Sequence, residues 1–285
     1  MKKVLFATTA LVLSAGFASA GDLSMAGYAR FGANYTEGAD DETRIESRLR
    51  ITVTATQETD SGMSLYASTR LQADDGGALA TNGAKFGVKS NGFSLEAGNI
   101  AGAIESKPNY YGAAEPGFTG ITGHYAGFGG SIDLYSSTAA GANGVRLAYS
   151  AGALSAVASF SDTSDAGERT AVSAAYAAEG FTAALGYQSD DDDDITIATL
   201  GGKLGSADVS AFYSNEDVAD NNSFGVSAAV PMGAATLQLS AATSDTEGDH
   251  YGAGVNYDLG GATFGAAVAS ADNVTVAEAG ISFSF

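Results

Sequence analysis

The sequence predicts an all-β fold, a transmembrane antiparallel β-barrel of 16 strands. Three observations predict it. Side chains alternate between apolar and polar with period two, long polar connections alternate with tight turns, and the chain ends on an aromatic residue. The composition agrees with a β fold, because 38 Gly and only 3 Pro accompany abundant Ala, Ser and Thr in 285 residues.

The first twenty residues have the pattern of a secretory signal peptide that is cleaved on export. Lys2 and Lys3 form a basic start, residues 4–17 are uncharged and largely apolar, and residues 18–20 supply the small-x-small pattern that precedes cleavage. The apolar run is shorter than the roughly 20 residues of a membrane-spanning helix. We therefore expect a mature domain of residues 21–285 without a transmembrane helix.

Charge and cysteine content exclude several classes of protein. Removal of Lys2 and Lys3 with the signal leaves 11 basic against 33 acidic residues, a net charge of −22. Such a balance argues against nucleic acid as a partner. The absence of Cys excludes a disulfide scaffold and Cys-ligated metal sites.

The second predicted strand shows the alternation most clearly. Ile45, Leu49 and Ile51 fall on one face of residues 43–56, and basic and Thr side chains fall on the other. Most predicted strands are close to the 9–11 residues of a tilted membrane-spanning strand. The sixteen predicted strands are 22–35, 43–56, 63–73, 84–90, 93–99, 144–150, 153–161, 169–177, 181–189, 195–203, 206–214, 223–230, 235–243, 250–257, 262–270 and 274–285.

The connections separate the two ends of the barrel. Odd-to-even connections such as 74–83 and 215–222 are longer and polar, whereas even-to-odd connections such as 91–92 and 151–152 are tight. Long loops at one end and short turns at the other are typical of outer-membrane barrels. An even number of strands brings both termini to the short-turn, periplasmic side.

A secreted β-sandwich is the alternative interpretation, since its strands alternate too. Two features favour the barrel. The apolar faces are rich in Ala and Gly, as suits a surface against lipid, and Ile281, Phe283 and Phe285 share one face at the C-terminus. This C-terminal pattern resembles the signal that barrel-assembly machinery recognises.

Three segments are characteristic: LSMAGYARFG at 23–32, SRLRI at 47–51 and ETDSG at 58–62. They resemble one family, the alphaproteobacterial (Rhodobacter-type) trimeric general porins, and the opening strand carries the closest resemblance. Residues 144–161 and 280–285 are similar too. The resemblance implies an outer-membrane homotrimer of sixteen-stranded barrels, surrounded by lipid and lipopolysaccharide, that passes small hydrophilic solutes and ions.

The same resemblance implies that the long third external loop folds into the lumen and constricts it. In this sequence that loop is residues 100–143, and it places Glu105 and Glu115 as the acidic side of the constriction. Lys107 and the small number of acids depart from the family pattern. The basic side predicted on the wall is Arg30, Arg48, Arg50 and Arg70.

The strand alternation independently places most basic residues on the polar face. Eight of the eleven basic residues after the signal share it: Arg30, Arg44, Arg48, Arg50, Arg70, Lys85, Lys89 and Arg146. A charge facing lipid at mid-depth would cost about 2–4 kcal/mol, so stability alone requires inward placement of each one. Seven of the eight come from the first four strands, a clustering that polarity of the lumen does not require.

Other motifs carry weaker signals. Residues 190–194 are five consecutive Asp, which suit either a solvated external loop or a structural Ca²⁺ site, and no other cofactor is predicted. His124 and His250 are too few and too separate to indicate a catalytic pair, and no nucleophile motif accompanies them. We therefore expect a diffusion porin and not an enzyme, with a non-channel surface barrel or adhesin as the alternative.

Overall fold

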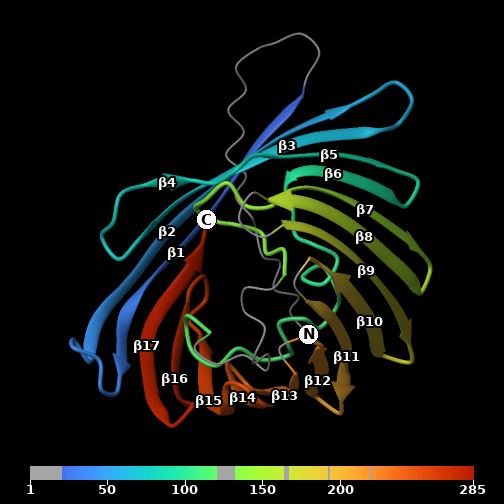
Figure 1. The fold of residues 1–285 in the computed structure, drawn as a ribbon. Coiled ribbons are helices and arrows are strands. Elements are labelled where there is room, and N and C mark those ends of the chain that lie inside the picture. The colour runs from blue at the N-terminus through green and yellow to red at the C-terminus, as the bar shows by residue number, and fades with distance from the viewer. Residues whose placement is uncertain (1–20, 121–131, 164–166, 192, 219) are drawn as a thin grey trace.

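The computed structural model describes residues 21–120, 132–163, 167–191, 193–218 and 220–285. Within these residues, seventeen strands form one antiparallel sheet that closes into a barrel (Figure 1). The strands are β1 (Asp22–Thr36), β2 (Thr43–Glu58), β3 (Ser64–Asp74), β4 (Ala80–Thr81), β5 (Lys85–Ser90), β6 (Phe93–Asn99), β7 (Asn143–Ala151), β8 (Leu154–Thr163), β9 (Gly167–Ala178), β10 (Phe181–Ser189), β11 (Asp194–Leu204), β12 (Ala207–Glu216), β13 (Asn221–Met232), β14 (Ala235–Ser244), β15 (Gly248–Asp258), β16 (Thr263–Ala271) and β17 (Val274–Ser284).

The sixteen predicted strands are confirmed, and their ends agree with the structure within two residues. The structure adds only β4, which pairs with Leu71 and Gln72 of β3. Two residues are too few to produce a periodic signal, which is why the sequence did not predict this strand. No helix among the described residues is long and apolar enough to cross a membrane.

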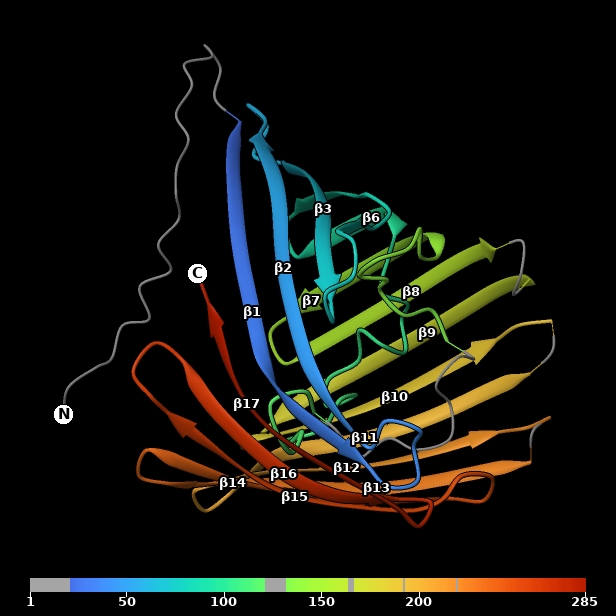
Figure 2. The ribbon, with the colours of Figure 1, turned by 90° about the vertical axis from the view of Figure 1, so that its left-hand side faces the viewer.

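The barrel closes where the first strand meets the last, side by side in Figure 2. β1 and β17 pair from Tyr28↔Ser284 to Thr36↔Val276. One step further, the backbone N–H of Gly27 donates to the carbonyl of Phe285 at 2.7 Å, and the N–H of Phe285 donates back at 3.0 Å. Closure pairs the first strand with the last over residues 27–36, which a membrane-spanning sheet requires because each unpaired backbone group in hydrocarbon costs several kcal/mol.

The two faces of the wall follow the predicted alternation. Large apolar side chains project outward, and Phe31, Ile45 and Leu185 are 54%, 73% and 65% exposed. Polar side chains on the opposite face, such as Arg30 and Asn34, are buried inside the barrel. An apolar outer surface around a polar lumen is the arrangement that suits a barrel in lipid.

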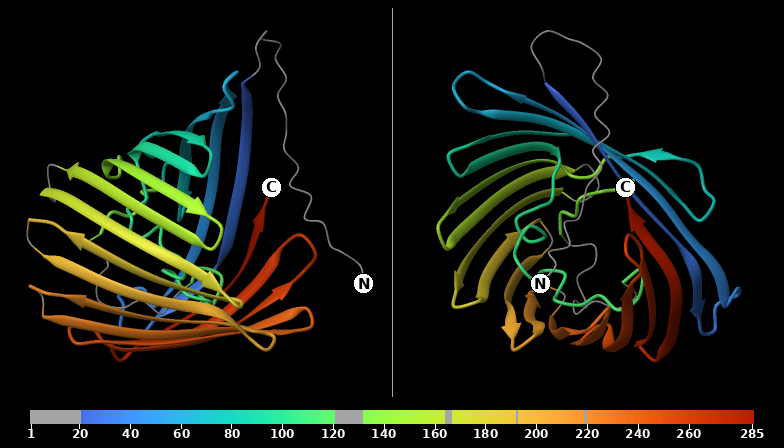
Figure 3. Two further views of the ribbon diagram at one scale, coloured as in Figure 1. Left: turned by 90° about the vertical axis from the view of Figure 1, so that its right-hand side faces the viewer. Right: turned by 180° about the vertical axis from the view of Figure 1, so that it is seen from behind.

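Between β6 and β7 the chain leaves the wall and runs inside the barrel (Figures 1 and 3). We call residues 100–142 the inner loop, of which 100–120 and 132–142 are described. Its apolar side chains include Ile104, which packs against Ile195 and Ile197 of β11 in a buried cluster. The lumen face of β11 is thus apolar where the inner loop covers it.

Phe285 is expected to be needed for barrel assembly. Its backbone extends the closing ladder to Gly27, and its ring lies over Gly27 beside the ring of Phe283, with centroids 6.0 Å apart. Deletion of Phe285 should reduce the heat-modifiable form of the protein in outer membranes, as seen on SDS gels, while export continues. Normal abundance and a normal band shift in the deletion strain would contradict this expectation.

Candidate functional site

Small hydroxyl side chains on the lumen face hold the backbone of the inner loop against the wall. The Thr199 hydroxyl donates to the carbonyl of Pro108 at 2.7 Å, and the N–H of Ala113 reaches the hydroxyls of Ser210 and Ser227 at 2.7 and 2.8 Å. Ser159 and Ser173 bind Ala103 in the same way, at 2.9 and 2.8 Å. Each bond satisfies a backbone group that would otherwise be buried without a partner.

The far end of the described inner loop docks between β1 and β17. The Phe118 ring lies over Gly32 and Gly280, and a Cβ at Gly280 would come within 2.7 Å of that ring. Next to it, Glu278 of β17 accepts hydrogen bonds from the N–H of Thr119, at 2.7 Å, and from the Thr119 hydroxyl. The space left by the two glycines and the carboxylate of Glu278 therefore position this part of the loop.

Glu105 joins the two limbs of the inner loop. Its carboxylate accepts the N–H of Tyr135 at 2.7 Å and also the hydroxyl of Tyr111. The returning limb is held to the wall by Asp133, which accepts a 2.5 Å hydrogen bond from Ser161 and pairs with Arg169 at 3.3 Å.

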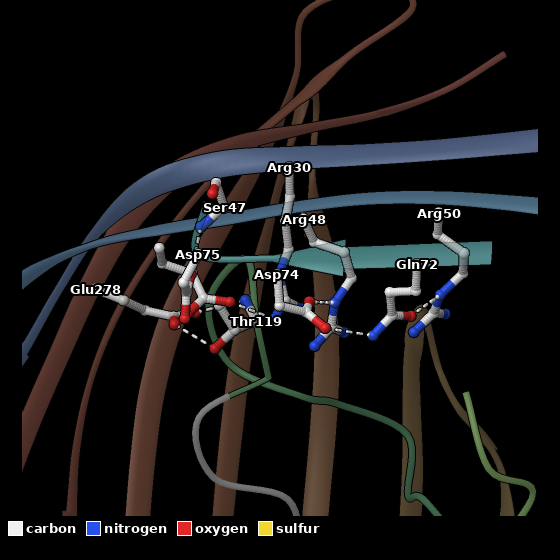
Figure 4. Close-up of polar contacts among 10 residues, drawn as sticks. Arg30, Ser47, Arg48, Arg50, Gln72, Asp74, Asp75, Thr119 and Glu278 are labelled. Carbon is white, nitrogen blue, oxygen red and sulfur yellow. Dashed lines mark hydrogen bonds and ion pairs between the residues drawn. The ribbon is translucent and has the colours of Figure 1, made fainter. Parts of the chain in front are cut away.

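Beside this docking site, β1 and β2 place two arginines directly across from each other (Figure 4). Arg30 is the Cα partner of Arg48 in the ladder, an arrangement that like charges make unfavourable. Carboxylates on the same wall offset it, because Arg30 pairs with Glu46 and Arg48 pairs with Asp74, both at 2.5 Å. These two arginines are thus partly neutralised within the wall itself.

Arg50 lies next along β2 and has a different environment. Its guanidinium donates to Gln72 at 2.7 Å, and Gln72 in turn donates to Asp74 at 2.7 Å (Figure 4). Among the described residues, no carboxylate lies within ion-pairing distance of Arg50 or Arg70. Arg70 instead donates to Ser137 of the inner loop at 2.7 Å. We call Arg30, Arg48 and Arg50 the arginine row. Within this row, Arg50 is the arginine whose positive charge toward the lumen is not offset by a carboxylate among the described residues.

The structure brings together four of the six predicted site residues. Arg30, Arg48, Arg50 and Glu115 line one space of about 620 Å³ between the wall and the inner loop. Desolvation by the surrounding lumen wall and inner loop raises the pKa of Glu115 above the usual value of a Glu. The other two lie elsewhere: Arg70 lines a neighbouring space, described below, and Glu105 is bonded within the loop.

The sequence did not predict the ion-pair partners Glu46 and Asp74, nor the contact of Glu278 with the loop. Glu46 does fall on the same face as Arg48 by alternation, and that signal could have identified it. The pairing of Arg48 with Asp74 depends on the β2–β3 register, where these two residues are Cα partners. The register is not available from one sequence.

Lys107 contributes less positive charge than the sequence suggests. It is 3% exposed, its Nζ has no hydrogen-bond partner among the described residues, and it lies 5.4 Å from the centroid of the Tyr110 ring. Burial lowers the pKa of Lys107 to about 7.

The described acidic residues at 190–194 do not fit a calcium site. Asp190 pairs with Arg169 at 3.4 Å and accepts the N–H of Asp193 at 2.7 Å, while Asp192 lies outside the described residues. No cluster of three or more metal-ligating side chains occurs in the part of the chain that is described. Of the two histidines, His124 lies outside that part, and His250 contacts the carbonyl of Glu247 at 3.2 Å.

A closed barrel with an apolar outer face, a polar lumen and an arginine-lined opening beside an inward-folded loop defines a transmembrane channel. Comparison with known proteins agrees. The family model of the Gram-negative porins matches residues 7–275. The chain therefore belongs to the Gram-negative porin family, and it is a diffusion porin of the outer membrane.

Individual relatives support the same assignment. The chain is 28% identical to a porin of Fuscovulum blasticum and 29% identical to a porin of Rhodobacter capsulatus, covering 93% of this chain and all of the relative in each case. A triple mutant of the Rhodopseudomonas blastica porin superposes with a TM-score of 0.83 at 26% identity, covering 92% of this chain and all of that one. The comparisons indicate a channel rather than an enzyme and do not favour a surface barrel or adhesin.

Substitution of Arg50 is expected to change ion selectivity. Arg50→Glu alters the charge beside the opening by two units, and a unit charge about 4 Å from an ion is worth about 1 kcal/mol in water. The cation-to-anion permeability ratio should rise at least fivefold in 0.1 M KCl, measured as the reversal potential in a salt gradient.

Arg44→Glu is the matched control, because Arg44 lies on the same strand and face but is exposed and does not line the opening. It should shift the ratio much less. Equal shifts for the two variants would mean that Arg50 does not border the conducting path.

Proposed function

We propose that diffusion through this porin is controlled at the opening between the inner loop and the wall. The basic side of this constriction is Arg30, Arg48 and Arg50, and the acidic side is Glu115. The observation that supports the proposal most directly is that these four side chains line one space. Charges of opposite sign on the two sides would orient dipolar solutes and disfavour bulky apolar ones.

Glu105 and Arg70 act differently in this proposal. Glu105 is a positioning residue, because its carboxylate ties Tyr111 and Tyr135 to each other across the loop. Arg70 lies beside the constriction and holds the returning limb through Ser137.

The net selectivity depends on two opposing contributions. The wall arginines attract anions, whereas the strongly acidic chain, at a net −20 with its signal, attracts cations to the mouths. Because Glu46 and Asp74 partly neutralise the arginine row, we infer weak cation selectivity. It should fade with rising salt as the Debye length falls below about 10 Å.

We further propose that the mature protein is residues 21–285, after cleavage of residues 1–20, and that it forms a homotrimer. The short strands β5 and β6, with six and seven residues, support the trimer. A tilted strand needs about 9–11 residues to cross the membrane, and β5 and β6 are shorter than that. The wall that they form would therefore be covered by a neighbouring protomer and not by lipid. Outer-membrane lipid and lipopolysaccharide would contact the remaining outer face.

Shortening the inner loop is expected to widen the channel. Deletion of residues 112–120 removes the segment that borders the opening but retains the packing of Ile104 on Ile195 and Ile197. Single-channel conductance in KCl should rise clearly, because the narrowest segment dominates the resistance. Heat-modifiability on SDS gels verifies that the variant has folded, and an unchanged conductance in the folded variant would refute the proposed constriction.

A further inference from the structure

A second cluster of basic residues lies in the lumen beside the constriction. Arg70, Lys85 and Lys89 line a space of about 530 Å³ together with Tyr66 and Tyr135. We propose that this cavity is a binding site for small multivalent oxyanions, such as phosphate-bearing solutes. The residues that line this cavity are not those that line the constriction.

Tyr66 lines the cavity from β3. Tyr66 is the ladder neighbour of Gly87, and its ring occupies the space that a side chain at Gly87 would need. The Tyr66 hydroxyl reaches across to Glu96 of β6 and donates to its carboxylate. Lys89 Nζ lies 4.9 Å from the centroid of the same ring, within cation–π range.

Tyr135 lines the cavity from the inner loop. Two cations lie against this ring: Arg70 Cζ is 4.9 Å from the centroid and Lys85 Nζ is 5.3 Å from it. The Tyr135 hydroxyl accepts a 2.8 Å hydrogen bond from Asn82, which fixes the ring in place. The two aromatic faces thus hold three cations around one space, and of these Lys85 is also paired with Glu96.

The charge balance of the lining favours an anion. Among the described residues, Glu96 is the only acidic side chain that lines the space. Its carboxylate is already engaged by Arg146 at 3.0 Å, by Lys85 at 3.4 Å and by the hydroxyl of Tyr66. Among the described residues, Arg70 and Lys89 have no carboxylate within ion-pairing distance. A guanidinium and an ammonium that project into one space are donors suited to phosphate oxygens.

The rest of the lining also favours a hydrated, hydrogen-bonding ligand. Hydroxyl side chains complete the wall of the cavity: Thr52, Thr54, Thr56, Ser64 and Ser68. All of them lie on the lumen face, so the ligand is a free solute in the channel and not a lipid headgroup. The proposal rests on the proposed channel function and adds to it a substrate class that would be retained beside the constriction.

Pyrophosphate block of single channels tests this site. In planar bilayers with 0.1 M KCl, millimolar pyrophosphate should reduce the KCl current through the unsubstituted porin in a saturable way. Lys85→Gln/Lys89→Gln should raise the half-blocking concentration at least fivefold and leave the unblocked KCl conductance nearly unchanged. Glu96 retains Arg146 and Tyr66 as partners in this variant, so the local hydrogen bonding persists. Lys89→Gln alone, which removes no ion pair, should give a smaller shift in the same direction.

Lys203→Gln is the matched control. Lys203 lies on the lumen-facing register of β11 near a short turn, on another sector of wall, and pairs with Asp208 at 2.6 Å. It should leave the block unchanged. A block that persists in Lys85→Gln/Lys89→Gln, or that is lost in Arg50→Gln alone, would overturn the proposal and place the anion at the constriction. A protein that conducts KCl without any block refutes the anion site only, whereas one that forms no channel refutes the proposed function.

Discussion

A sheet that crosses a membrane must satisfy every backbone N–H and C=O internally, and the rest of this structure depends on that constraint. The pairing of β1 with β17, extended to Phe285 and Gly27, meets it by closing the wall. Closure fixes one face toward lipid and one toward water, so side chains must alternate along every strand. It also encloses a lumen whose width the wall alone does not regulate.

The inner loop supplies that regulation, and the lumen wall is adapted to receive it. Ser210 and Ser227 bind its backbone, Gly280 makes room for Phe118, and Glu278 holds Thr119. The two serines lie on β12 and β13, whereas Gly280 and Glu278 lie on β17, the strand that pairs with β1 beside the arginines. Docking therefore places the opening beside Arg30, Arg48 and Arg50, and a single arrangement determines both the size and the charge of the passage.

The sequence predicted the wall well and the interior only in part, for physical reasons. Alternation is a local property, so all sixteen principal strands were recoverable within two residues of their ends. The contacts of the loop are not local. Ile195 and Ile197 face the lumen because the loop covers them, and the partners Glu46 and Asp74 follow from strand register. Glu105 was predicted on the acidic side of the passage, whereas in the structure its carboxylate joins two limbs of the loop.

Docking of the inner loop on the wall is the central claim, and a reversible tether tests it most directly. The chain has no Cys, and the N–H of Ala113 lies 2.8 Å from the hydroxyl oxygen of Ser227, so a disulfide between Ala113→Cys and Ser227→Cys would join the loop to β13. The account predicts that the disulfide forms in nearly every molecule and that single-channel conductance is the same oxidised and reduced. Failure to cross-link, or a conductance that changes on reduction, would contradict it.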